Sequence, residues 1–503
     1  MTDLEYDVVV VGSGGGALAG AMLAQKAGLR TVVLEKTDRI GGTSAYSGGA
    51  CWLPGSQVQQ RAGVADSTDS ARTYLGAVLE QTDQAKVEAF LAEAPRLVAA
   101  LEEDPALDFE WLPFPEYFDA PGRVSTGRSI QPLNVRRDEL PEAVAALVRP
   151  PVERDRAGQE GRRTLSGGQA LIARLGWAFV REGGTVLTRH CMDRLVVEDG
   201  RVVGVEADTD AGRVTFRAGR GVLVAAGGFE HDPQMRAQHG VPGASEWSMA
   251  PAGTNTGEPI RAAAEAGAAT DLMHEGWFCP GVEQPDGGGS FTLGFRGGLI
   301  VDQGGVRYAN ESLPYDRFGR EMAKSADRIP SWFVFDSREG GRLPAIGMPE
   351  GDPEAHLEAG TWVRADTVEE LAGRLQAPHL GESVERFNGY AATGVDEEFG
   401  RGADEYDTFF AFTGQDPNKA LLPVDQPPFY AARMVLSDLG TKGGLVTDPA
   451  GRVLREDGSV IPGLYASSNS SASMAGAAYP GPGVPLGTAM VFASLAVQDM
   501  RTR

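Results

Sequence analysis

The stretch YDVVVVGSGGGALAGAMLAQKAGLRTVVLEK, residues 6–36, decides the fold because it joins a strand, a glycine turn, a helix and a second strand. Tyr6 to Val11 is an apolar, β-branched run that predicts a buried strand. Gly14 to Ala27 is rich in alanine and leucine and predicts a helix, and Thr31 to Glu35 predicts the next strand. This order is the βαβ half of a doubly wound α/β sheet.

The turn of this unit matches the pattern G-x-G-x-x-G/A through Gly12, Gly14 and Ala17, with Gly16 between the last two. Glycine permits a tight turn and lets backbone amides approach a pyrophosphate, which the N-terminus of the helix also favours. Glu35 ends the following strand, where a carboxylate can accept a hydrogen bond from a ribose hydroxyl. The stretch therefore predicts a dinucleotide site.

The loop that follows, residues 36–55, reads KTDRIGGTSAYSGGACWLPG. A nicotinamide-binding domain would normally continue here into another βα unit. Instead, paired glycines with Thr43, Ser44 and Ser47 give a backbone that can lie along a pyrophosphate and reach an isoalloxazine ring. The loop favours FAD over NAD; the alternative is a surface loop that happens to be rich in glycine and serine.

Composition excludes several classes of protein. With 503 residues, the chain is long enough for two or three domains. A net charge of −23 argues against binding to nucleic acid, which needs clustered lysine and arginine, and it would repel an anionic membrane surface. The N-terminus lacks the basic residues of a secretory signal, and there is no unbroken apolar stretch of about 18 residues. We expect a cytoplasmic protein that is at most peripheral to a membrane.

Cysteine and histidine do not indicate a metal site. Cys51, Cys191 and Cys279 are isolated, without a CxxC spacing, so the sequence indicates neither a disulfide framework nor a zinc site. The six histidines form no HExxH or similar ligand pattern. No metal is proposed, and a reducing compartment suits the free thiols.

The rest of the chain suggests two domains. The predicted features are helical sequence at 68–104 and 169–181, a charged surface excursion at 149–163, a hairpin turning at Asp199-Gly200 within 194–208, a strand at 221–225, and a final helix at 483–500. Beyond residue 277, glycine-rich loops and aromatic strands indicate an α+β insert. We expect a Rossmann-like FAD-binding domain built from residues 1–276 and 441–503, and a catalytic domain at 277–440.

Three motifs resemble one known family. Gly41-Gly42-Thr43-Ser44, Ala225-Ala226-Gly227-Gly228-Phe229, and GLYASSN followed by GPGVPLGTAM are similar to the flavoproteins of the fumarate reductase and ketosteroid dehydrogenase family, and the resemblance spans the whole chain. Members that link FAD covalently do so through a histidine near residues 44–49. This chain has none there, so the resemblance implies non-covalent FAD.

The predicted FAD-binding set combines the turn, the loop and the positions that the resemblance implies. It comprises Gly12, Ser13, Gly14, Gly16, Ala17, Glu35, Lys36, Gly42, Thr43, Ser44, Ser47, Gly48, Gly49, Ala226, Gly227, Asn469, Pro485 and Leu486. No second dinucleotide fingerprint is visible. The expected electron acceptor is therefore a quinone or another carrier, as in the family, rather than NAD.

Within the family, three tyrosines resemble those of the 3-ketosteroid Δ1-dehydrogenase branch: Tyr117 in FPEY, Tyr315 in NESLPYD, and Tyr479 in YPGPG. The resemblance implies that Tyr479 and the Gly483 amide hold the C3 oxygen of a 3-ketosteroid. It also implies that Tyr315 takes a proton from C2 while flavin N5 takes a hydride from C1. Tyr117 would donate a hydrogen bond to Tyr315 and favour its phenolate.

Three other functions stay open at this stage. A Δ4-(5α)-dehydrogenase is the nearest rival, although the full YPGPG continuation favours the Δ1 branch. A dicarboxylate reductase needs cationic side chains for two carboxylates, and we find no matching histidine and arginine constellation in the second domain. A non-catalytic nucleotide-binding protein would lack steroid-dependent bleaching of the flavin.

Overall fold

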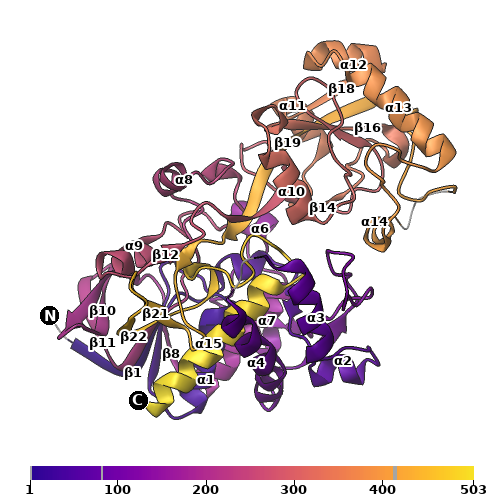
Figure 1. The fold of residues 1–503 in the computed structure, drawn as a ribbon. Coiled ribbons are helices and arrows are strands. Elements are labelled where there is room, and N and C mark those ends of the chain that lie inside the picture. Colours follow the sequence, from indigo (N-terminus) through magenta and orange to yellow (C-terminus); the bar gives the residue numbers. More distant parts are fainter. Residues whose placement is uncertain (1–2, 81–82, 412–415) are drawn as a thin grey trace. The chain divides into compact units, whose positions relative to one another are not determined.

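The computed structural model describes residues 3–80, 83–411 and 416–503. These fold into two compact units (Figure 1). The first unit comprises the chain up to His239, then Ala250–Gly276 and Gly440–Arg503. The second comprises Gly240–Met249 and Trp277–Leu439. Both ends of the sequence therefore build the first unit.

The first unit is built on an eight-stranded sheet whose centre is the opening strand. β1 pairs in parallel with β2 on one side and with β11 on the other, and Val8 to Val11 are almost completely buried. The main order is β21-β22-β11-β1-β2-β8, and β10 joins β11 and β9 through antiparallel pairs. The strands are β1 (Asp3–Val11), β2 (Thr31–Leu34), β8 (Thr185–Leu187), β9 (Cys191–Glu198), β10 (Arg201–Thr209), β11 (Gly212–Val224), β21 (Arg452–Leu454) and β22 (Val460–Ala466).

Smaller pairings complete this unit. β3 (Cys51–Trp52), β4 (Phe109–Leu112) and β5 (Ser129–Pro132) form a three-stranded sheet, while β6 (Val135–Arg136) pairs with β7 (Thr164–Leu165), and β12 (Thr270–Asp271) pairs with β20 (Gly444–Leu445). The predicted hairpin is confirmed: Asp199 and Gly200 both have positive φ between β9 and β10. The predicted strand at 221–225 is the end of the longer β11.

Helices from both ends of the chain pack together in the first unit. α15 (yellow in Figure 1) packs against α1 and α4. The helices are α1 (Gly15–Lys26), α2 (Gln57–Arg61), α3 (Thr68–Val78), α4 (Gln84–Glu102), α5 (Glu142–Ala145), α6 (Val152–Arg156), α7 (Gly167–Arg181), α8 (Pro233–His239), α9 (Glu258–Glu265) and α15 (Val484–Thr502). The predicted helical run at 68–104 is thus two helices, and residues 81–82 lie outside the described part. Among the described residues, none of the helices combines the length and the apolar sequence that crossing a bilayer requires.

The second unit has its own sheet and core. The main sheet has the order β13-β19-β16-β15, β18 also pairs with β19, and β14 pairs separately with β17. Its strands are β13 (Gly276–Val282), β14 (Phe291–Leu293), β15 (Leu299–Val301), β16 (Ser331–Phe335), β17 (Ile346–Met348), β18 (Trp362–Ala365) and β19 (Phe429–Thr441). Its helices are α10 (Tyr315–Ala323), α11 (Pro353–Ala359), α12 (Val368–Leu375), α13 (Leu380–Thr393) and α14 (Glu405–Phe409). Leu299, Val334, Leu371 and Phe387 are completely buried in its core.

One segment departs from the predicted division. Gly240–Met249 was expected in the first domain but packs with the second unit. The Met249 N–H donates to Asp438 O at 2.9 Å, and Ser437 Oγ donates to Trp247 O at 2.6 Å. Ser248 Oγ adds a 2.7 Å bond to the Asp438 carboxylate. These bonds to the end of β19 hold the segment in the second unit.

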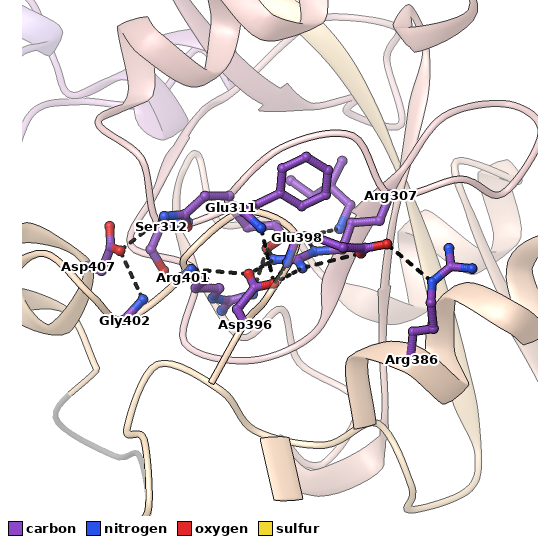
Figure 2. A network of polar contacts seen from close by, with 12 residues as sticks. Arg307, Glu311, Ser312, Arg386, Asp396, Glu398, Arg401, Gly402 and Asp407 are labelled. Atoms are coloured by element: carbon purple, nitrogen blue, oxygen red, sulfur yellow. Dashed lines mark hydrogen bonds and ion pairs between the residues drawn. The ribbon is translucent and has the colours of Figure 1, made fainter. Parts of the chain in front are cut away.

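A buried ion network lies inside the second unit (Figure 2). Arg307 binds Glu311 and Asp396, each at 2.8 Å, and Arg401 Nη1 lies 3.0 Å from Glu311 Oε2. All four side chains are at most about one-hundredth exposed. Burial by itself would raise the pKa of Glu311, but the guanidinium groups of Arg307 and Arg401 hold it below its ordinary value. The stability that this carboxylate contributes is present above about pH 4.3 and is lost as the pH falls through the lower folded value.

We predict that Glu311→Gln destabilises the protein by about 3–5 kcal/mol, because it leaves two buried guanidinium groups without a full counter-charge. Glu398→Gln is the matched control, since Glu398 lies 4.0 Å from the same Arg307 but its side chain is 32% exposed. The control should change stability by less than about 1 kcal/mol. Urea unfolding of both variants at pH 7 measures the difference, and equal effects would contradict the prediction.

Candidate functional site

The glycine turn after β1 brings backbone segments unusually close together. Gly12 has φ +100°, and its N–H donates to Leu34 O at 2.8 Å. A Cβ at Gly12 would lie 2.4 Å from Ala225 O. A Cβ at Gly16 would lie 2.5 Å from Ser468 Oγ and 2.9 Å from the Ala489 side chain. Only glycine allows β11 and α15 to approach this turn, which leaves the start of α1 open to an anion.

Glu35 follows β2 and is held in a fixed orientation. Its carboxylate accepts a hydrogen bond from Ser13 Oγ, and it accepts two more from Thr37, from N at 2.8 Å and from Oγ1 at 2.9 Å. These bonds use three of roughly four acceptor positions on a carboxylate. One position on Oε2 is left for a ribose hydroxyl, which is the role predicted for this residue.

The small-residue loop lies against the glycine turn and the start of α7. Gly41, at φ +115°, donates its N–H to Ser13 Oγ at 3.0 Å, and Gly15 N donates to Ser44 Oγ at 3.1 Å. Gly168 N donates to Ser47 O at 2.9 Å. A Cβ at Gly49 would lie 2.4 Å from the backbone of Gly167. The loop is therefore fixed against the glycine turn and α7 by its backbone, although Ser47 and Gly48 are exposed.

Residues from the middle and the end of the chain join the same region. Ala226 N donates to Ser470 Oγ at 2.9 Å, and Ser470 Oγ donates to Gly227 O at 2.7 Å. Asn469 lies in the same short 3₁₀ helix, Ser468–Ser470. Pro485 and Leu486 open α15, where Leu486 Cδ2 lies 3.0 Å from the position of a Cβ on Gly15. Most of the predicted FAD set thus gathers around the N-terminus of α1.

Lys36 has protein partners of its own. Its ammonium group lies 2.8 Å from Glu258 Oε1 and 2.6 Å from Thr256 Oγ1. The predicted charged excursion at 149–163 is wrong at its first residue: Arg149 is buried, with Nη2 donating to Thr37 Oγ1 at 2.8 Å and Nη1 to Asp155 at 2.7 Å. Because Arg149 opens a run of charged residues, the sequence did not indicate that it is buried. Its bond to Thr37 supports the residue that donates to Glu35.

These observations fit a dinucleotide such as FAD, whose pyrophosphate and flavin half would lie along the small-residue loop. The cradle at Gly12 and Gly14, the free acceptor position on Glu35, and the glycine loop provide the expected contacts to pyrophosphate and ribose. No histidine lies within residues 36–55, so the loop offers no histidine for covalent attachment of a flavin. Ser13 orients Glu35 through its side chain, a role that the glycine pattern alone does not reveal.

Two of the three predicted catalytic tyrosines lie together in the first unit. The rings of Tyr117 and Tyr479 pack edge to face with centroids 5.2 Å apart, and both side chains are buried. Tyr117 N donates to Pro480 O at 3.0 Å. The Tyr74 hydroxyl donates to the same carbonyl at 2.6 Å and accepts from Phe118 N at 3.2 Å. Tyr74 therefore ties the two tyrosine segments together, and nothing in its sequence context signalled this.

The proline loop after Tyr479 is fixed at its far end too. Ser129 Oγ donates to Pro482 O at 2.5 Å, and Trp52 N donates to Gly483 O at 3.0 Å. Gly483 has φ +87°, and a Cβ there would lie 2.4 Å from the Ala50 carbonyl group. In the described part of the chain, the Gly483 N–H has no intramolecular acceptor. The loop thus presents an amide that can bind an external oxygen.

Buried charges support this loop, and they were not predicted. Arg128 binds Glu116 at 2.7 Å and Asp66 at 2.9 Å, with all three side chains fully buried. Trp52 Nε1 donates to Glu116 Oε1 at 2.9 Å. Burial raises the pKa of Glu116 although the Arg128 guanidinium opposes the rise. Glu116 directly precedes Tyr117, so the ion pair fixes the backbone that carries the tyrosine.

Tyr315 belongs to the second unit. It is the first residue of α10, it is buried, and its ring packs edge to face on Phe291 at 4.8 Å. The preceding residues are anchored by the network of Figure 2: Glu311 Oε1 accepts from Ile300 N at 3.1 Å, and Asn310 Nδ2 donates to Asp407 at 3.0 Å. The segment that leads into Tyr315 is therefore held by buried charge.

The glycine turn, Glu35 and the small-residue loop define the class of FAD-binding flavoproteins. A family model described as an FAD binding domain matches residues 7–486. The 3-oxosteroid 1-dehydrogenase of Rhodococcus opacus is 42% identical over 514 residues, covering 99% of this chain and 98% of the relative. The 4-oxocyclohexanecarboxylate 2-dehydrogenase of Sinomonas cyclohexanicum is 33% identical and covers 98% of this chain and 92% of its own.

Among solved structures, the 3-ketosteroid delta1-dehydrogenase from Sterolibacterium denitrificans, in complex with 1,4-androstadiene-3,17-dione, has a TM-score of 0.91 at 32% identity. It covers 99% of this chain and 100% of its own. The chain therefore belongs to the 3-oxosteroid 1-dehydrogenase family of FAD-dependent oxidoreductases. The predicted family, fold class and FAD cofactor are confirmed.

We predict that Gly12→Ala lowers both the FAD content and the melting temperature, because the new Cβ would overlap Ala225 O. Gly28→Ala is the matched control: Gly28 has φ +83° but nothing within 4 Å of the new Cβ. The control should keep its FAD and lose only the roughly 1–2 kcal/mol of a left-handed alanine. Flavin absorbance per protein and thermal unfolding measure both effects. Full FAD content in Gly12→Ala would contradict the predicted cradle.

Proposed function

We propose that this protein desaturates the C1–C2 bond of 3-ketosteroids. The observation that carries the proposal is the rigid loop from Tyr479 to Gly483. Its Tyr479 phenol lies beside the buried Tyr117, and the backbone of Gly483 is held through its carbonyl, so the loop offers a hydroxyl and an N–H as donors. The relatives named for this reaction and the similar solved structure support it. A dicarboxylate would need cationic groups, whereas these are the donors that suit one neutral ketone oxygen.

The reaction requires a proton to leave C2 and a hydride to leave C1. Negative charge then builds on the C3 oxygen, and preorganised donors stabilise this charge more than they stabilise the neutral ketone. In the proposal, the Tyr479 hydroxyl and the Gly483 N–H donate to that oxygen. Both donors are neutral, so binding an apolar steroid beside them does not require a formal charge to be desolvated.

We assign the removal of the C2 proton to Tyr315, with Tyr117 as the hydrogen-bond donor that favours its phenolate. A phenol has an ordinary pKa of about 10, so ionisation at pH 7 costs about 4 kcal/mol. This cost must be met by the neighbouring hydroxyl and by concerted enolisation, which favours an alkaline pH optimum.

Bound FAD supplies a two-electron acceptor for the C1 hydride. The residues that would hold it are those gathered around the start of α1, including Gly14, Glu35, Ser44 and Leu486. We propose that the first unit is the FAD-binding domain and that the second is the catalytic domain. We also propose that a quinone or another carrier, rather than NAD, accepts the electrons afterwards.

The decisive experiment mixes the yellow holoenzyme anaerobically with androst-4-ene-3,17-dione. We expect the flavin to bleach and the product to lose two hydrogens, with the new double bond at C1–C2. No bleaching would overturn the proposal. A C4–C5 double bond formed from a 5α-steroid would favour a Δ4-(5α)-dehydrogenase. Faster bleaching by 4-oxocyclohexanecarboxylate than by the steroid would indicate that the substrate is a small cyclic ketone.

We predict that Tyr315→Phe lowers kcat by at least about 100-fold with little change in KM, because it removes the base while keeping the ring. Tyr308→Phe is the control in the same unit, since its buried hydroxyl is hydrogen-bonded to Ser331 Oγ at 2.8 Å. It should cost about 1 kcal/mol of stability and leave kcat nearly unchanged. Wild-type turnover by FAD-loaded Tyr315→Phe would disprove the assignment.

A further inference from the structure

A buried arginine lies behind the residue that orients Glu35. Arg149 donates from Nη2 to Thr37 Oγ1 at 2.8 Å and from Nη1 to the Asp155 carboxylate at 2.7 Å. Thr37 in turn donates to Glu35 Oε1, from N at 2.8 Å and from Oγ1 at 2.9 Å. A chain of hydrogen bonds therefore runs from the Arg149 guanidinium to the carboxylate that we expect to bind a ribose hydroxyl of FAD.

The backbone of Arg149 is itself held from two directions. Its N–H donates to Ile40 O at 3.1 Å, and Ile40 N donates to Leu147 O at 2.9 Å. Gln169 Nε2, which comes from α7, donates to Arg149 O at 2.6 Å. The guanidinium is therefore a fixed point to which Thr37 is attached.

The bond from Arg149 also decides how the Thr37 hydroxyl donates. A hydroxyl has one hydrogen and two lone pairs. Because the guanidinium donates to one lone pair, the hydrogen is left for the remaining acceptors, which are Glu35 Oε1 at 2.9 Å and Arg39 O at 2.8 Å. The carboxylate is the stronger acceptor because it is charged, and the guanidinium polarises the O–H bond that donates to it.

An ion pair with Asp155 alone does not explain where Arg149 lies. The Asp155 side chain is 21% exposed, whereas the Arg149 side chain is only 7% exposed and contacts Thr37 beside the buried Glu35. Burying a guanidinium costs free energy that an ion pair at the surface does not require. The planar guanidinium makes both bonds at once, which a lysine ammonium group cannot reproduce with the same geometry. The bond to Thr37 is therefore a feature that stability alone does not require.

We propose that Arg149 is a positioning residue for FAD, which acts by holding Glu35 in the orientation that accepts the ribose hydroxyl. Ser13 donates to Oε2 of this carboxylate and Thr37 donates to Oε1, and Arg149 keeps Thr37 in place. Without the guanidinium, the carboxylate has to be ordered when FAD binds, and the cost of that ordering lowers the affinity. This inference rests on the proposed role of Glu35 and does not depend on which substrate the flavin oxidises.

The test measures FAD binding in the absence of steroid. Dilution of the holoenzyme gives the dissociation rate constant from the fluorescence of released FAD, and titration of the apoprotein gives Kd. For Arg149→Met we expect Kd to rise by about tenfold or more, mainly through faster dissociation. Arg149→Lys, which keeps the charge but lacks the planar pair of donors, should recover part of the affinity.

A second variant removes the link without removing the ion pair. Thr37→Val loses only the hydroxyl, and it should raise the Kd of FAD by a factor similar to that of Arg149→Met. Adding Arg149→Met to Thr37→Val should raise Kd by less than about twofold more, because both changes break the same chain of bonds. The increase in melting temperature on adding FAD should shrink in parallel with affinity.

Arg174→Met is the matched control. Arg174 is a partly buried arginine of α7 that donates to Ala106 O at 2.6 Å, Leu133 O at 2.7 Å and Asn134 O at 3.0 Å, none of which belongs to the predicted FAD-binding set. This variant should lower the melting temperature of the apoprotein and keep the Kd of FAD within about twofold. It separates general loss of stability from loss of cofactor positioning.

A wild-type Kd in Arg149→Met would overturn the inference, and so would a wild-type Kd in Thr37→Val, even if Arg149→Met did not fold. Losses that multiply in the double variant would show that Arg149 does not act through Thr37. An equal rise in Kd in Arg174→Met would show that FAD binding reports only general stability. Steroid-dependent bleaching is measured separately on the wild-type holoenzyme, so its absence would reject the proposed function and leave the result for Arg149 unchanged.

Discussion

The architecture of the first unit depends on how closely two helices from opposite ends of the chain can approach each other. Gly16 of α1 lies where any side chain would overlap Ala489 of α15, and Gly20 lies near Ala493 in the same way. The absence of side chains at these positions lets the C-terminal helix pack against the nucleotide turn. Because that packing places Leu486 over the start of α1, the same glycines define both the sheet-helix core and the proposed flavin site.

The loop from Tyr479 to Gly483 is held mainly through its carbonyl oxygens. Proline has no N–H, so the loop cannot donate from those positions, and its carbonyls accept instead from Tyr74, Tyr117 and Ser129. This arrangement leaves the Gly483 N–H available while the backbone stays fixed. A similar logic applies to Tyr315, whose preceding segment is anchored by buried arginines rather than by apolar contacts. Both proposed catalytic segments are therefore fixed by buried polar groups.

The structural elements that could be predicted well from the sequence are those whose residues lie close together in the chain. The β1-α1-β2 unit and the β9-β10 hairpin follow from periodicity and turn residues within about 30 positions. The tyrosines were found through resemblance, since an isolated tyrosine signals nothing. Tyr74 was missed because its partner, Pro480, lies about 400 residues further along the chain. The placement of Gly240–Met249 failed for the same reason: it depends on hydrogen bonds to Ser437 and Asp438.

The pairing of α1 with α15 also has a consequence for how the protein is made. About 460 residues separate the end of α1 from the start of α15. At the usual pace of a ribosome, roughly 5–20 residues per second, the apolar face of α1 waits for about 20–90 s before its partner helix is synthesised. β22, which completes the sheet beside β11, is also made near the end. The apolar face of α1 must therefore be kept from aggregating during translation, and the proposed flavin site cannot form before α15 has been made.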